Sequence, residues 1–229
     1  ECRRRLMRAC RELLQAQQFE LAIQLAAAVS RFVSASESVA MQAAAQQAWA
    51  ENFEQPAAGL PPSKVAPVRS QARQARRSAG RLFAQLAGLR FASRRYPDDL
   101  WASAQNYLAG QDYERAIRQL EAYIESQKPQ SRPPALVAIG ECLLALNRPE
   151  EAIQRLTECI VQYPKDPHRY RAKLIAAQAY SELNKMEPAK ELLANNLYDD
   201  ALTPRSIEWR ESQYLLGKTS YQEGLQCTA

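Results

Sequence analysis

Few residues that could support acid–base or metal chemistry occur in this sequence, and they lie far apart. The single histidine, His168, falls in a loop-like Lys-Asp-Pro-His-Arg-Tyr segment, where exposure to solvent is the ordinary situation. Five cysteines are present, and none forms the closely spaced pair that a zinc site needs. They are Cys2, Cys10, Cys142, Cys159 and Cys227. We expect the three that fit helical patterns, Cys10, Cys142 and Cys159, to be buried free thiols, with a disulfide as the alternative.

The carboxylates do not form a catalytic arrangement either. They occur singly or as neighbours in turns, as at Asp98-Asp99 and Asp199-Asp200. The first pair precedes Leu100, where it would cap a helix and interact favourably with the helix dipole. The sequence contains no nucleophile elbow, no zinc-protease motif and no glycine-rich phosphate loop. We therefore predict a protein that is not an enzyme and that uses no metal or cofactor.

One segment, residues 64–95, is strongly basic. It carries nine positive charges, no acidic residue lies between Glu54 and Asp98, and the whole chain has a net charge of only +5. The charges belong to Lys64, Arg69, Arg73, Arg76, Arg77, Arg81, Arg90, Arg94 and Arg95. The candidate basic patch on this predicted helix consists of Arg69, Arg73, Arg76, Arg77 and Arg81.

The basic patch has two interpretations. It could bind an acidic protein, a nucleic acid or an anionic lipid surface. It could instead be a solvated helix face, or one that pairs with acidic residues of neighbouring helices, and we favour this second interpretation. No aromatic residues are interleaved with the arginines to stack on bases, so nucleic acid is a disfavoured ligand.

The composition predicts that helices position these residues. The chain has 229 residues, of which 46% are hydrophobic and only seven are glycine. Alternating β-branched stretches are rare and good helix formers abound, so an all-α chain is expected. No apolar run approaches the roughly 18 residues that span a bilayer. Because the chain begins with Glu1 rather than methionine, we expect an excised part of a longer protein.

A pair of amphipathic helices over residues 136–164 recurs along the chain. Its stripes contain the small residues Gly140 and Ala152, which would allow the two helices to approach closely. The second position recurs 36 residues earlier as Ala116 and 37 residues later as Ala189. Each of these alanines follows a small residue by twelve positions and precedes a leucine by four. The small residues are Ala104, Gly140 and Ala177, and the leucines are Leu120, Leu156 and Leu193.

This pattern resembles the tetratricopeptide repeat (TPR), a helix pair with a period of about 34 residues. The resemblance covers residues 98–224 well, residues 3–33 moderately and residues 38–97 poorly. It implies an all-α, right-handed superhelical solenoid of antiparallel helix pairs. Repeats that end in Tyr-Pro, as at Tyr163-Pro164, are similar in style to those of bacterial periplasmic assembly and cell-division proteins. Either the periplasm or the cytoplasm is compatible with the sequence.

The predicted organisation has five segments. They are divergent TPR-like helices over 1–54, a proline-rich loop over 55–67, a long basic helix over 68–97, three repeats over 98–204, and the first helix of a further, truncated repeat over 205–229. The density of prolines in 55–67 argues against a helix there. Tyr96-Pro97 is expected to end the basic helix. Near the N-terminus, Ser34 or Ser36 is available as an N-cap for the helix expected over residues 39–53.

The resemblance implies that the first helices of the pairs line a concave groove, which would bind a helix or an extended peptide of a partner protein. The expected groove residues are Trp101, Gln105, Leu108, Val137, Glu141, Leu144, Leu174, Gln178, Ser181, Tyr214, Lys218 and Tyr221. For Leu108, Val137 and Leu144, packing against the next layer of helices is an equally good alternative. We therefore predict a protein–protein interaction scaffold, with self-association through the last helix as a further option. The alternatives are binding of nucleic acid or an anionic surface by residues 64–95, and a non-catalytic regulatory part of a larger protein.

Overall fold

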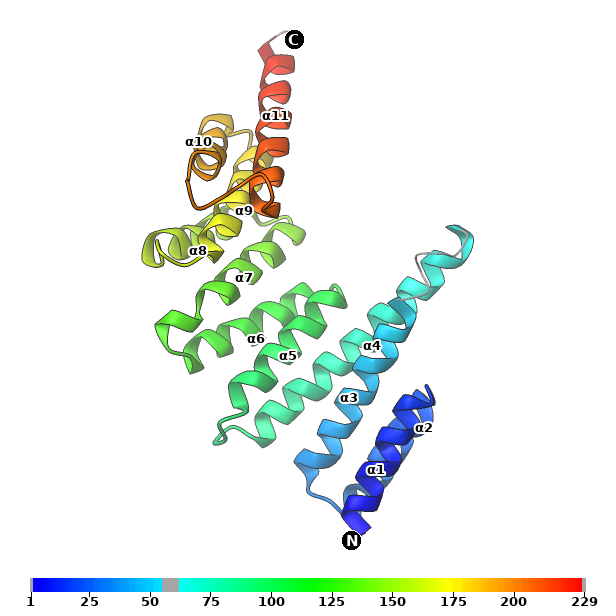
Figure 1. The fold of residues 1–229 in the computed structure, drawn as a ribbon. Coiled ribbons are helices and arrows are strands. Elements are labelled where there is room, and N and C mark those ends of the chain that lie inside the picture. Colours follow the sequence, from blue (N-terminus) through cyan, green and yellow to red (C-terminus); the bar gives the residue numbers. More distant parts are fainter. Residues whose placement is uncertain (1, 55–61, 228–229) are drawn as a thin grey trace. The chain divides into compact units, whose positions relative to one another are not determined.

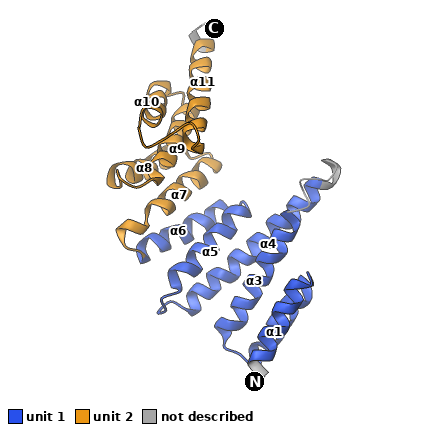
Figure 2. Ribbon diagram, in the orientation of Figure 1, with its two compact units in different colours: residues 1–126 blue, residues 127–229 orange. Residues whose placement is uncertain are grey.

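The structure is a computed structural model that describes residues 2–54 and 62–227. All of its regular structure in these ranges is helical: eleven α-helices, two short 3-10 helices and no strand. The chain divides into two compact units, residues 1–126 and residues 127–229 (Figure 2). Within each unit, consecutive helices pack on one another (Figure 1). The prediction of an all-α fold built from sequential helix packing is confirmed.

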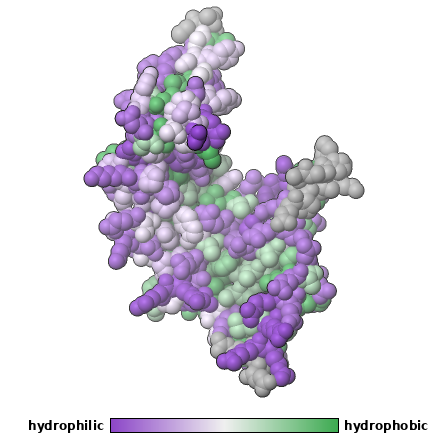
Figure 3. All heavy atoms as spheres, viewed as in Figure 1, coloured by the Kyte–Doolittle hydropathy of each residue, from purple (hydrophilic) through white to green (hydrophobic). Residues whose placement is uncertain are grey.

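Unit 1 contains six of the described α-helices. They are α1 (Cys2–Gln15), α2 (Phe19–Ala28), α3 (Ala35–Glu54), α4 (Pro62–Leu89), α5 (Tyr96–Ala109) and α6 (Tyr113–Ser126). Unit 2 contains α7 (Pro133–Ala145), α8 (Pro149–Gln162), α9 (His168–Glu182), α10 (Met186–Leu197) and α11 (Ile207–Cys227). No helix in the described ranges has the length and apolar character needed to cross a membrane. On the face in Figure 3, hydrophilic residues predominate over unit 2, and hydrophobic residues gather over the middle of unit 1.

Four helix pairs share the same tight turn. In each turn one residue has a positive φ of 56–58°, and it is Gln17, Gln111, Asn147 or Asn184 rather than a glycine. At Asn147 the backbone N–H donates to the carbonyl of Leu144 at 2.8 Å. The next N–H, of Arg148, donates to Leu143 at 2.9 Å, which satisfies carbonyls left over at the end of α7. This shared geometry reverses the chain between α1 and α2, α5 and α6, α7 and α8, and α9 and α10.

The repeated small residues lie where the helices of a pair cross. Gly140 of α7 faces Leu156 of α8 so closely that a Cβ atom placed on Gly140 would lie 2.5 Å from the Leu156 Cδ2. Ala104 and Ala116 are both completely buried, in α5 and α6. The sequence pattern therefore marks the positions of closest approach, and the leucine four residues after each key alanine fills the core beside it.

Two predicted boundaries in the middle of unit 1 are wrong. Residues 62–67 belong to α4 rather than to a loop, with Pro67 inside the helix; residues 55–61 lie outside the described residues. Pro62 occupies the first helical position, where a missing N–H costs nothing, and Pro67 removes only one hydrogen bond near the start of a long helix. The basic helix also stops at Leu89, and Tyr96-Pro97 opens α5 instead of closing α4, because proline suits the first turn of a helix.

Candidate functional site

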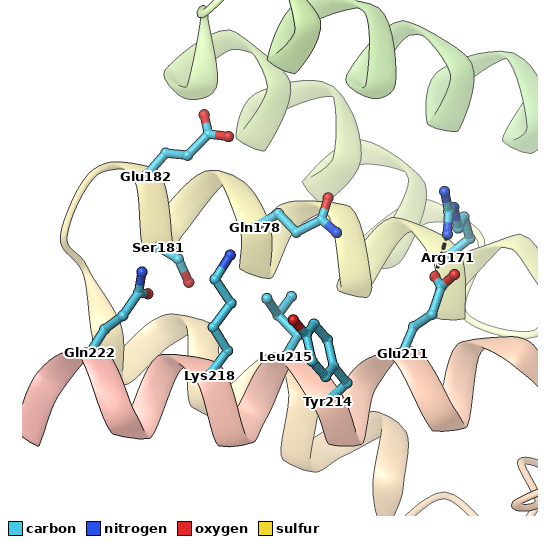
Figure 4. Close-up of a pocket in the computed structure, with 9 residues that line it drawn as sticks. All are labelled: Arg171, Gln178, Ser181, Glu182, Glu211, Tyr214, Leu215, Lys218 and Gln222. Atoms are coloured by element: carbon cyan, nitrogen blue, oxygen red, sulfur yellow. Dashed lines mark hydrogen bonds and ion pairs between the residues drawn. The ribbon is translucent and has the colours of Figure 1, made fainter. Parts of the chain in front are cut away.

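A cavity of about 520 Å³ lies between α9 and α11 in unit 2 (Figure 4). Its lining comes from two helices that are each the first of a predicted pair. The residues are Arg171, Gln178, Ser181, Glu182, Glu211, Tyr214, Leu215, Lys218 and Gln222. The Lys218 side chain extends from α11 toward Gln178 and Ser181 of α9 (Figure 4). The cavity combines an aromatic ring, hydrogen-bonding amides and a hydroxyl with charges of both signs.

Packing of α11 against α9 and α10 sets the geometry of this site. The buried side of α11 carries Ser212, Leu215 and Thr219. Leu215 joins a core cluster with Leu174 of α9 and Leu193 of α10. Because these residues occupy one side of the helix, residues on its other side stay exposed. Tyr214 is 74% exposed although it neighbours a core leucine.

A chain of charges links three first helices of unit 2. Arg171 of α9 donates from Nε to Glu141 of α7 at 3.0 Å and from Nη1 to Glu211 of α11 at 2.6 Å. The guanidinium is therefore neutralised by carboxylates on both neighbouring helices. Among the described residues, Lys218 has no carboxylate partner, so it is the uncompensated cation that the cavity offers to a ligand.

Several predicted groove residues come together here. Gln178, Tyr214 and Lys218 line the cavity, as does Ser181, and Tyr221 is 69% exposed on the same helix. On α7, Glu141 is held by the ion pair to Arg171 and Leu144 is half-buried. Three further predicted residues, Trp101, Gln105 and Leu108, are on α5 in unit 1. Of these, Gln105 is exposed, Leu108 is half-buried, and the Trp101 ring packs on Tyr123 with centroids 5.1 Å apart.

Two residues predicted to face the groove are core residues instead. Leu174 is completely buried, and Val137 is only 6% exposed. Leu174 contributes to the cluster that joins α9 to α10 and α11. Val137 is buried because α7 packs against both α8 and α9, which covers most of its circumference. Neither side chain is available to a partner.

Sequence reasoning missed the charged residues at one end of the cavity. Arg171 precedes Gln178 by seven residues, and Glu211 precedes Lys218 by seven. A seven-residue step is close to two helical turns, so each lies on the same face as a residue that was predicted. Extending the expected face by two turns would have found both residues.

The basic patch of α4 is largely engaged within unit 1. Arg76 forms a two-pronged ion pair with Glu54 of α3, through Nε at 2.8 Å and Nη2 at 2.6 Å. This hydrogen bonding raises the pKa of the Arg76 guanidinium further above its ordinary value, although burial opposes the shift. Arg73 donates to the Gln111 side chain at 3.0 Å, and Arg77 donates to the Gly110 carbonyl at 2.7 Å. Among the described residues, Arg69 and Arg81 make no ion pair.

The described residues contain no cluster of three or more His, Cys, Asp or Glu side chains that could hold a metal ion. His168 opens α9 and lies 2.8 Å from the Asp166 carboxylate in an exposed position. Burial raises the pKa of the Cys142 and Cys159 thiols to about 12, so both stay protonated and unreactive. Cys10 is also a buried free thiol, as expected for all three.

Comparison with known proteins agrees with this architecture. Residues 107–168 match the family model described as tetratricopeptide repeat. Among solved structures, one similar to this chain is a Podosopora anserina protein whose own TPR-like repeats are nearly identical to one another. Its sequence is 19% identical to this chain, with a TM-score of 0.55 over 89% of this chain and 97% of that chain. The structure of MamA MSR-1 C2 is 12% identical, with a TM-score of 0.49 over 93% of this chain and 96% of that chain. No curated protein sequence matches the chain.

The family match is confined to residues 107–168, and the fold of the chain as a whole is that of a TPR-like helical repeat array. Such repeats are in general modules for protein–protein interaction, and they are usually non-catalytic.

Proposed function

We propose that this protein is an interaction scaffold that binds a short segment of a partner protein in the cavity between α9 and α11. The observation that carries the proposal is the cavity itself, which is open to solvent beside the 74% exposed ring of Tyr214. An exposed tyrosine buries a large area on binding at a small cost in conformational entropy. Tyrosine is therefore a side chain that suits an anchor in an interface.

The polar lining fits a peptide better than an apolar small molecule. Gln178, Ser181 and Gln222 can each donate and accept hydrogen bonds, as the main chain of an extended segment requires. Lys218 adds a positive charge that favours a segment with a carboxylate near its centre. The ion pairs of Arg171 hold α7, α9 and α11 in register, so the site is prearranged before the ligand arrives.

A peptide selection tests this proposal. Peptides from a random library would be selected on the immobilised full chain, and their dissociation constants measured for Tyr214→Ala and Lys218→Ala variants. Tyr198→Ala is the matched control, because Tyr198 is 86% exposed but lies outside the cavity. We expect Tyr214→Ala to weaken binding at least tenfold and Tyr198→Ala to leave it within twofold. Selected peptides that bind the Tyr214→Ala variant as tightly as the Tyr198→Ala control would overturn the proposal.

Two further aspects of the function are the self-association of the protein through α11 and its cellular compartment. Self-association through α11 is favoured by the exposure of Tyr214, Tyr221 and Leu225, and the molar mass at increasing protein concentration tests it. A constant monomer mass would exclude this option. The sequence leaves the periplasm and the cytoplasm open, and localisation of the full-length protein in cells would decide between them.

A further inference from the structure

A row of four arginines runs along α4 in unit 1. Arg69, Arg73, Arg77 and Arg81 follow one another at four-residue steps. Such a step advances a helix by slightly more than one turn, or about 6 Å, so the guanidinium groups follow one another along one side of the helix. We call these four residues the arginine row.

The arginine row keeps its positive charge. Arg73 and Arg77 are held at their places by neutral acceptors, the Gln111 side chain and the Gly110 carbonyl. Gly110 packs so tightly there that a Cβ atom on it would lie 2.8 Å from the Arg77 Cγ. By contrast, Arg76 is neutralised by Glu54. None of the carboxylates in the described part of the chain forms an ion pair with a member of the row.

Two hollows adjoin the row, and they differ in character. One, of about 520 Å³, is lined by Phe53, Glu54, Arg69, Ala72, Arg73, Ala109 and Gln111. The other, of about 590 Å³, is lined by Ser70, Arg73, Gln74, Arg77 and Gln111. The first hollow thus has apolar groups beside two arginines, whereas the second presents only polar side chains. Arg73 and Gln111 belong to both, so the two hollows are neighbours.

We infer that the arginine row is a second binding surface, which takes an acidic polypeptide segment of a partner protein. Carboxylates of that segment pair with the row, since guanidinium groups bind carboxylates through charge-assisted hydrogen bonds. An apolar side chain of the same segment enters the first hollow, against Phe53 and Ala72. This surface belongs to unit 1, so it is independent of the cavity between α9 and α11.

The hollow beside Phe53 favours a polypeptide over a nucleic acid. Glu54 lines it and is already paired with Arg76, so this hollow presents a neutral ion pair and apolar groups rather than an unbroken run of cations for a phosphate backbone. The Phe53 ring is already stacked on Trp49, with centroids 5.8 Å apart and an interplanar angle of 28°, so it is a poor platform for a base. A polypeptide can place an apolar residue at this point and carboxylates on either side of it.

The test uses the full chain and a labelled probe peptide of glutamates with one central phenylalanine, followed by fluorescence anisotropy. The double variant Arg69→Gln/Arg81→Gln removes the two members of the row that hold no described partner. Arg205→Gln/Arg210→Gln removes the same charge from exposed positions in unit 2 and is the matched control. Unchanged far-ultraviolet circular dichroism of both variants shows that the fold is kept.

We expect the dissociation constant of the probe to rise at least tenfold in the row variant and to stay within twofold in the control. Replacing the central phenylalanine of the probe by glycine should also weaken binding. Equal losses in both variants would mean a non-specific charge effect and overturn the inference. A single-stranded oligonucleotide that displaces the probe and binds more tightly would show instead that the row serves nucleic acid. Failure here leaves the Tyr214 test unaffected, because the two tests share no variant and no ligand.

Discussion

At the scale of the residue, Gly140 shows how one missing side chain lets α7 and α8 pack together. A methyl group there would lie 2.5 Å from Cδ2 and 2.6 Å from Cγ of Leu156. Leu156 is completely buried, so it cannot swing into solvent. We expect Gly140→Ala to lower the free energy of unfolding by about 1–3 kcal/mol, the usual cost of overpacking a core. Urea denaturation of the full chain measures the effect.

Gly217 provides the opposite case within the same unit and serves as the control. It lies inside α11, and a Cβ atom placed on it would meet nothing within 4 Å. Gly217→Ala should therefore raise the free energy of unfolding by about 0.5–1 kcal/mol, because alanine loses less backbone entropy in a helix. Destabilisation by both substitutions would contradict the close-approach account of Gly140.

Asp199 predicts a dependence of stability on pH. Its carboxylate accepts hydrogen bonds from the Ala201 N–H, the Tyr170 hydroxyl and the Arg169 guanidinium, which tie the segment after α10 to the start of α9. The Ala201 and Tyr170 hydrogen bonds, with the charge of Arg169, hold its pKa below the ordinary value of 3.8. Because the pKa is lowered in the folded state, the ionised carboxylate stabilises the fold, and this contribution is fully present at pH values above 3.8. This contribution is lost as the pH falls through the lowered pKa.

The variant Asp199→Asn should accordingly have a lower urea midpoint than the wild type at pH 7. The difference should shrink as the pH is taken below the ordinary pKa of an aspartate, 3.8 here. Asp200→Asn changes the neighbouring carboxylate and is the control at every pH. A midpoint difference that is the same at all pH values would mean that the hydrogen bonds matter through their geometry and not through the charge of Asp199.

At the scale of the element, the start of α3 is fixed by a reciprocal pair of hydrogen bonds. Ser34 Oγ accepts from the Glu37 N–H at 3.3 Å, and the Ser34 N–H donates to the Glu37 carboxylate at 3.2 Å. This is a capping box, which satisfies two backbone donors at once. Ser34→Ala should cost about 0.5–2 kcal/mol of unfolding free energy. Ser220→Ala, at an exposed position within α11, should change it little, and equal effects would argue against the cap.

The elements that could be predicted from the sequence are those whose packing repeats. The small residues at Ala104, Gly140 and Ala177 recur because every helix crossing imposes the same steric limit, so the pairs from α5 to α10 were foreseeable. The bounds of α4 were not, because Pro67 is inside a helix whose neighbours stabilise it, and such tertiary support has no local signal. A proline marks a boundary only where nothing else holds the helix.

The candidate site was predictable in part for a related reason. Helical spacing gives the direction of a side chain, and it placed Gln178 and Lys218 on the faces of α9 and α11 that line the cavity. It does not give the depth to which a neighbouring helix covers that face, so Leu174 was expected at the surface although it is core. The ion pairs of Arg171 join helices thirty and forty residues apart in sequence, and only the fold brings those charges together.

At the scale of the whole molecule, the two candidate surfaces are built from different units and share no residue. Each should therefore respond only to its own substitutions. We expect Tyr214→Ala/Lys218→Ala to leave the dissociation constant of the acidic probe within twofold of the wild-type value. Arg69→Gln/Arg81→Gln should likewise leave binding of the selected peptides unchanged. In the quadruple variant the losses of binding free energy should match those of the separate variants to within about 0.5 kcal/mol, as for independent sites.

Titration of one ligand in the presence of saturating amounts of the other completes the test. Independent surfaces have no coupling free energy, so each ligand should have the same dissociation constant with and without the other. Because any coupling acts equally in both directions, either ligand can be the one that is titrated. A shift of fivefold or more would mean that the ligands bias one shared conformational equilibrium. In that case the scaffold would be an allosteric one, and binding an acidic partner segment in unit 1 would itself regulate the cavity between α9 and α11.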